Sequence, residues 1–134
     1  MTYLLDTNAI SDFMRAAPTI ENWMAGLEPG DRVVTCTIVR GELLFGIAQL
    51  PEGKRRAELE ETGHQFLAVF PCKPVPERAG DLYATIKVAR QQRGLALDEN
   101  DLWVAATALA LGATLVSRDA DFAAIESLSV VALR

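Results

Sequence analysis

The chain has 134 residues, 50% of them hydrophobic, which suits one domain with a substantial core. Its net charge of −5 argues against a passive nucleic-acid-binding protein, because such proteins usually carry a positive surface. No apolar run approaches the roughly 18 residues of a membrane span, and Met1-Thr2 lacks the basic segment of a signal peptide. We therefore expect a single domain over residues 1–134, no membrane association and a cytoplasmic location.

Short β-rich runs alternate with longer helical segments along the chain. In order, we expect a strand at 3–5, helices near 8–16 and 19–27, a strand at 32–36, helices near 37–50 and 53–67, an extended piece at 68–75, helices near 76–94 and 99–111, a strand at 113–117, a turn near 120–125 and a strand at 128–133. Strands separated by helices favour right-handed βαβ crossovers. The predicted fold class is therefore α/β, a three-layer sandwich with a mostly parallel central sheet of four or five strands.

The first strand ends on three polar residues, Asp6, Thr7 and Asn8. Any one of them can cap the following helix, so a cap alone does not explain all three. In open parallel sheets, ligands bind beyond the carboxyl ends of the strands, where the strand order reverses. Asp6 falls at such an end, and Asp119 follows the strand at 113–117 after one intervening residue, Arg118. These two acids are candidates for a shared site.

Glu42 lies in the middle of the helix predicted at 37–50. Its helical face also carries Ile38, Phe45 and Gly46, and a charged group on an apolar face is costly unless it is paired or bound to a metal. The alternative is a partly exposed Glu42 paired with Arg40. That residue is two positions away and points elsewhere on the helix.

Asp98 and Asp101 begin the helix predicted at 99–111. Asp98 stands at a plausible N-cap position, and Asp101 can complement the helix dipole in the first turn. The face of Asp101 also carries side chains suited to packing on a sheet, namely Val104, Ala105, Ala108 and Leu109. Asp101 would thus be the fourth acid directed at one sheet edge.

Four carboxylates in a small volume repel one another and resist ionisation, unless a hard divalent cation binds them. Mg²⁺ prefers oxygen ligands and can activate a water or polarise a phosphoryl oxygen. No competing apparatus is evident, since the only histidine, His64, is expected on a helix surface. Cys36 and Cys72 show no metal-ligand spacing, and we interpret them as reduced packing residues.

Four short motifs occur in order along the chain: LLDTNAI, VRGELLFG, NDLWVAATAL and LVSRDADF. In these motifs the chain resembles a PIN-domain ribonuclease, and within that family the small VapC-type toxins of bacterial toxin–antitoxin pairs. The resemblance implies that four acids are catalytic and hold the metal: Asp6, Glu42, Asp101 and Asp119. It also implies Mg²⁺-dependent endonucleolytic cleavage of RNA, with Mn²⁺ able to substitute, a homodimer, and a cognate VapB-like antitoxin that covers the site.

Several residues are expected to support these acids. Thr7 and Asn8 would cap the helix and orient Asp6, and Asp98 would act from the helix start. Ser117 stands where a hydroxyl can hold a water or a phosphate oxygen. Asp121 is expected as a supporting group or a helix cap, and either Asp119 or Asp121 is the fourth acid, with Asp119 favoured.

Contacts outside the acids are less defined by the sequence. Candidates for the RNA backbone are basic residues: Arg15, Lys54, Arg55, Arg56 and Arg118. The helices predicted at 37–50 and 53–67 carry more apolar residues than a monomer needs to expose, which favours docking of a second copy and of the antitoxin. These residues are Leu43, Leu44, Ile47, Leu50, Leu59, Phe66 and Leu67.

Two other functions fit part of the pattern. A phosphatase of the haloacid-dehalogenase type also places an Asp after its first strand, but it requires a second Asp at position 8, which is Asn here. It also requires a late lysine, and no lysine follows Lys87. A catalytically silent RNA- or protein-binding module is the other alternative, although all four acids are intact and the net charge is negative.

Overall fold

The structure is a computed structural model, and it describes residues 1–133. In chain order the elements are β1 (Thr2–Leu5), α1 (Thr7–Met14), α2 (Pro18–Ala25), β2 (Arg32–Cys36), α3 (Thr37–Ala48), α4 (Lys54–Val69), β3 (Cys72–Lys73), α5 (Glu77–Gln92), α6 (Glu99–Ala110), β4 (Thr114–Ser117), the 3-10 helix η1 (Ala120–Ala124) and β5 (Val130–Ala132). The predicted alternation of strands and helices is confirmed.

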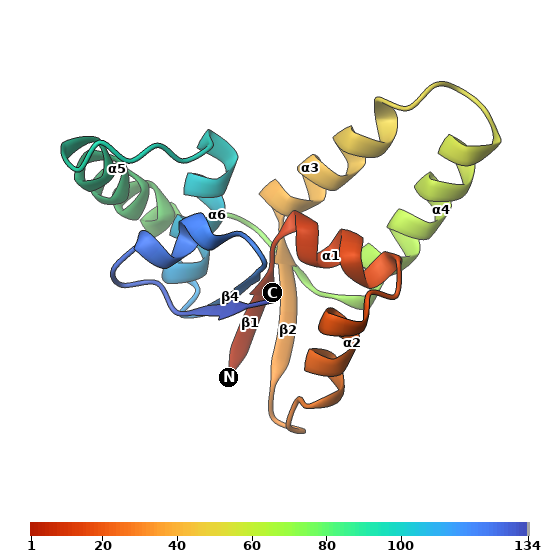
Figure 1. Cartoon of the computed structure of the whole chain (residues 1–134), viewed down its shortest axis with the longest axis horizontal. Coiled ribbons are helices and arrows are strands. Elements are labelled where there is room, and N and C mark those ends of the chain that lie inside the picture. The colour runs from red at the N-terminus through yellow and green to blue at the C-terminus, as the bar shows by residue number, and fades with distance from the viewer. Residues whose placement is uncertain (134) are drawn as a thin grey trace.

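The strands form one five-stranded sheet in the order β3-β2-β1-β4-β5, and every pair is parallel. In Figure 1, helices α1 to α4 lie to the right of β1 and β2, whereas α5 and α6 lie to the left. The predicted three-layer α/β fold is confirmed. The chain adds strands on one side of β1 to reach β3, and later on its other side with β4 and β5, so the strand order reverses between β1 and β4.

The core lies along the two central strands. Leu4 and Leu5 of β1 and Leu115 and Val116 of β4 are all fully buried. These strands are continuous apolar runs instead of alternating ones, because helices cover both faces of a parallel sheet. The polar residues that follow β1 and β4 are therefore held on a rigid support.

Local signals explain where the helices begin and end. Pro18 opens α2, where its missing N–H costs no hydrogen bond. Gly112 follows α6 with a φ of 64°, the left-handed conformation that ends a helix with least strain in glycine. The chain continues from this turn directly into β4, which begins at Thr114.

Three predictions about apolar and extended segments need correction. The piece expected at 68–75 is mostly helix and loop, because α4 continues to Val69 and β3 has only two residues. Cys36 is a buried free thiol as expected, but Cys72 is exposed on the short edge strand and is not a packing residue. Of the apolar residues expected to be exposed, three lie in the core: Leu43, Ile47 and Leu67.

No helix within residues 1–133 combines the length and apolar character needed to cross a membrane.

Candidate metal centre

Asp6 and Asp119 lie where the strand order reverses. β1 pairs directly with β4, Asp6 immediately follows β1, and Asp119 comes two residues after the end of β4. Asp6 is buried, and its Oδ1 accepts a hydrogen bond of 2.8 Å from the backbone N–H of Ala9, so Asp6 itself is the N-cap of α1. The sheet edge predicted to hold the site therefore does carry both acids.

Glu42 reaches this edge from α3, and two side chains orient it. The hydroxyl of Thr7 donates to Glu42 Oε1 at 2.9 Å, and the amide Nδ2 of Asn100 donates to Oε2 at 3.5 Å. Within residues 1–133 Glu42 forms no ion pair with Arg40, so the alternative pairing considered above is not observed. Its two carboxylate oxygens instead accept from Thr7 on α1 and Asn100 on α6.

The start of α6 supplies two further acids. Asp98 is the N-cap, and its carboxylate accepts a hydrogen bond of 3.2 Å from the backbone N–H of Asn100. Asp101 follows in the first turn, and its helical face packs inward through the buried Val104, Ala105 and Ala108, as predicted. Oxygen atoms of Glu42, Asp98 and Asp101 all lie within 4.8 Å of one another. This is a ligand set of the kind that a hard divalent cation prefers.

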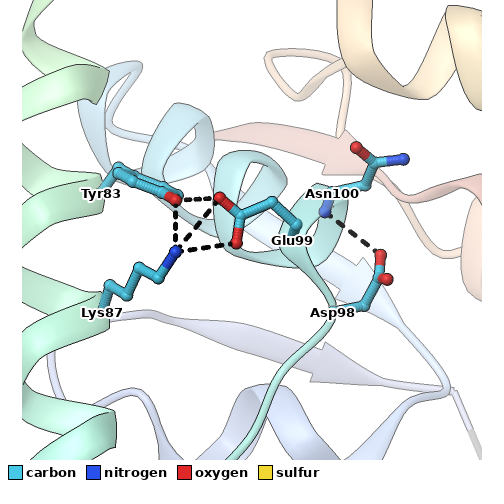
Figure 2. Close-up of polar contacts among 5 residues, drawn as sticks. All are labelled: Tyr83, Lys87, Asp98, Glu99 and Asn100. Carbon is cyan, nitrogen blue, oxygen red and sulfur yellow. Dashed lines mark hydrogen bonds and ion pairs between the residues drawn. The ribbon is translucent and has the colours of Figure 1, made fainter.

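A polar network on α5 anchors this helix start (Figure 2). Lys87 Nζ lies 3.2 Å from Glu99 Oε2, and the Tyr83 hydroxyl also donates to Glu99. The Tyr83 ring stacks on Trp103, with 4.1 Å between centroids and 8° between planes. Because Glu99 lies between Asp98 and Asn100, contacts to Glu99 fix the backbone that presents the acids.

The acids perturb one another strongly. Burial, followed by the negative charges of Asp98, Glu42, Asp119 and Asp6, raises the pKa of Asp101 to about 7. Burial is also the main cause of the raised pKa of Asp6, which the Ser117 hydroxyl and the Ala9 N–H partly offset. Bringing a divalent cation to this cluster would relieve the repulsion that disfavours the ionised carboxylates. The residues thus fit a divalent metal ion.

The structure corrects the roles expected for several supporting residues. Thr7 does not cap α1, because it binds Glu42, and Asn8 is exposed. Ser117 is fully buried and its Oγ accepts from the Asp119 N–H, so its hydroxyl supports the acids and is not open to a phosphate. Asp119, not Asp121, caps η1, and the Asp121 N–H donates to it at 2.9 Å.

One contributor was missed in the sequence, and the role of another was underestimated. Asn100 stands inside the third motif, yet nothing in its spacing indicated a bond to Glu42 on another helix. Asp98 was expected only as a supporting cap, whereas its carboxylate lies within ligand distance of Glu42 and Asp101. The signal for this role was the spacing of the two acids: Asp98 stands three residues before Asp101 at the start of a helix, and residues at this spacing lie on the same face.

Comparison with known proteins places this geometry in a family. The PIN domain family model matches residues 3–128. Ribonuclease VapC1 of Haemophilus influenzae is 31% identical over 123 residues, covering 89% of this chain and 87% of that protein. A VapBC2 structure from Rickettsia felis, bound to a DNA fragment from its promoter, superposes with a TM-score of 0.90 at 24% identity over the full length of both chains. A Mycobacterium tuberculosis member of the VapBC family of toxin–antitoxin systems, VapBC-5, superposes with a TM-score of 0.75 at 26% identity, covering 99% and 98% of the two chains.

Proposed function

The chain belongs to the PIN-domain family, and we propose that it is a metal-dependent endoribonuclease that acts as the toxin of a toxin–antitoxin pair. The observation that carries this proposal is the group of oxygens from Glu42, Asp98 and Asp101 within 4.8 Å of one another. Asp6 and Asp119 follow strands at the strand-order reversal, where α/β sheets bind ligands, and their negative charges contribute to the raised pKa of Asp101. The similarity to a named VapC ribonuclease supports RNA as the substrate class.

The proposed metal is Mg²⁺, with Mn²⁺ as a substitute. Its proposed ligands are Asp6, Glu42, Asp101 and Asp119, with Asp98 as an additional donor. When bound, the metal supplies charge stabilisation at the phosphoryl group and lowers the pKa of a coordinated water. The reaction is hydrolysis of a phosphodiester: a bond forms between the water oxygen and phosphorus, the bond to one sugar oxygen breaks, and that oxygen takes up a proton.

Neighbouring groups hold these acids in place for the reaction. Thr7 and Asn100 fix both oxygens of Glu42, which leaves its carboxylate little rotational freedom. The Ser117 hydroxyl accepts from the backbone N–H of Asp119 at 3.0 Å and lowers the pKa of Asp6. Because these bonds exist before substrate arrives, the site is preorganised for an anionic phosphate and its metal.

We propose that all of residues 1–134 form one nuclease domain, which acts in the cytoplasm as a homodimer and is inhibited by a VapB-like antitoxin. A groove of about 370 Å³ lies between α1, α3 and α4, with Thr7 and Glu42 at one end and Leu43, Ile47 and Leu50 along its wall. Its apolar wall suits a helix of the antitoxin, and the acids at its end suit a basic side chain. The similarity to VapBC structures supports this partner.

Incubation of single-stranded RNA with the purified protein, with and without Mg²⁺, tests the function. We expect cleavage only with the metal, and none by Asp6→Asn, because a buried charged ligand is lost while Asn can still cap α1. Asp81→Asn, an exposed substitution on α5 with the same charge change, should retain full activity. Hydrolysis of p-nitrophenyl phosphate without RNA cleavage would favour the phosphatase, and folded protein with neither activity would favour a binding module. Wild-type cleavage rates in Asp6→Asn would refute the assigned site.

A further inference from the structure

Asp12 is a buried acid that the metal centre does not use. It lies on α1, is only 9% exposed, and was not singled out in the sequence. Its two carboxylate oxygens bind different arginines: Oδ1 accepts from Arg15, and Oδ2 lies 3.1 Å from Arg118 Nε. A carboxylate in such surroundings requires paired charge, and two cations exceed what is needed to neutralise it. The cluster is therefore a small site of net positive charge.

Arg118 connects this cluster to the acids. It directly precedes Asp119 at the end of β4, and its positive charge lowers the pKa of Asp6. Asp12 holds it through Nε, whereas its side chain is 48% exposed. Within residues 1–133 its terminal Nη atoms donate no hydrogen bond, and its ion pair with Asp12 is closest at Nε. A guanidinium anchored at Nε keeps its terminal N–H donors available in a fixed plane, which matches two oxygens of a phosphate.

Arg15 extends the positive charge along the rim of the groove. Its side chain is 64% exposed, and it lines the groove together with Thr7 and Glu42. Arg15 and Arg118 come from opposite ends of the chain, yet one carboxylate brings them together next to the candidate metal centre. A protein of net charge −5 that acts on RNA needs local cations of this kind to offset its own repulsion of the phosphates.

We propose that Asp12 positions Arg118 and Arg15 to bind backbone phosphates of single-stranded RNA beside the acidic cluster. The proposal rests on the nuclease function given above. In it, Arg118 contacts a phosphate directly, whereas Asp12 acts only through the arginines and is a positioning residue. If Asp12 served only to tie α1 to the end of β4, its replacement would lower stability but leave RNA binding by the folded protein unchanged.

Salt dependence of RNA binding tests the phosphate contact proposed for Arg118. The probe is a fluorescein-labelled oligouridine, and its affinity is measured by anisotropy from about 50 to 200 mM salt in an Asp101→Asn background. Arg118→Gln should reduce the slope of log Kd against log salt by about 0.7, the change expected for one lost contact to a single strand. Arg32→Gln is the matched control, since exposed Arg32 starts β2 at the opposite end of the sheet and should leave the slope unchanged.

Kinetics in the otherwise wild-type protein test Asp12. Asp12→Asn makes the protein less negative, so charge alone predicts equal or tighter RNA binding. Positioning instead predicts weaker RNA binding, so that KM rises on the order of tenfold, that Asp12→Glu recovers part of the loss, and that Asp12→Asn adds little to Arg118→Gln. Losses that add fully in the double variant would overturn the positioning role.

The outcomes separate this inference from the proposed function. If the wild-type protein cleaves RNA but Arg118→Gln leaves the salt slope unchanged, the nuclease stands and the phosphate-binding role is refuted. If the wild-type protein neither binds nor cleaves RNA, both are refuted. If Asp12→Asn fails to fold, the Arg118→Gln slope alone decides, because Arg118 is half-exposed and its replacement leaves Asp12 paired with Arg15.

Discussion

Replacing Asp101 by Asn should stabilise the metal-free protein at neutral and alkaline pH. In the fold, the pKa of this carboxyl is raised from 3.8 to about 7 by burial and four neighbouring acids. The folded state therefore binds this proton more tightly than the unfolded state, so stability falls as pH rises from about 4 to about 7 and stays reduced above that range. Asp101→Asn removes the titrating group and with it this loss.

The magnitude follows from the same values. A rise in pKa from 3.8 to about 7 corresponds to about 4 kcal/mol when fully expressed. Because Asp101 is only half-buried, solvent screening reduces the expected gain to roughly 1–2 kcal/mol. For a domain of this size that gain raises Tm by roughly 4–8 °C.

Circular dichroism melts in EDTA, from pH 4 to pH 8, measure this gain. The difference in Tm between Asp101→Asn and the wild type should be near zero at the acid end and reach its full value above pH 7. Asp81→Asn removes the same charge from an exposed position on α5 and should show no such pH-dependent gain. A Tm difference that is absent at pH 8, or equal at both ends of the range, would refute the electrostatic reasoning.

Two further predictions concern the cell and the assembly. Expression of the chain alone should arrest growth of a bacterial host. Glu42→Gln should relieve the arrest, because it neutralises an acid that Thr7 and Asn100 orient. Arrest that persists with soluble, folded Glu42→Gln would show that toxicity does not come from this site. Light scattering should find a dimer for the chain alone and a larger assembly when the chain is co-expressed with the product of the adjacent reading frame. A strict monomer that does not bind this product would contradict both the homodimer and the antitoxin partner.

The sequence was sufficient to predict the fold and the convergence of the acids. The alternation of apolar runs with helical periodicity indicated the α/β class, and the rule that ligands bind at the carboxyl ends of parallel strands selected Asp6 and Asp119. Glu42 and Asp101 were recognisable because a charged side chain on an apolar helical face needs a partner. Each of these inferences depends on residues close in sequence or on a general rule for parallel sheets.

Contacts between distant segments were beyond the reach of the sequence. Asp12 looks like an ordinary helix acid until the end of β4 brings Arg118 against it. Thr7 was expected to cap its own helix, but Asp6 takes that position and frees the Thr7 hydroxyl for Glu42. The exposure of Cys72 followed from the shortness of an edge strand, which no local pattern specifies.

The pairing of β1 with β4 has a consequence for the order of events during synthesis. Ribosomes deliver the chain from its N-terminus, so Asp6 emerges first, and Asp119 emerges only after the segments that form β2, β3, α3 to α6 and β4 have been made. β1 can bind β2 early, but its other edge stays unpaired until β4 arrives. A nascent or prematurely terminated chain that stops before β4 lacks the fourth acid and the strand that aligns it. The producing cell therefore meets a complete acidic centre only after β4 and Asp119 have been translated.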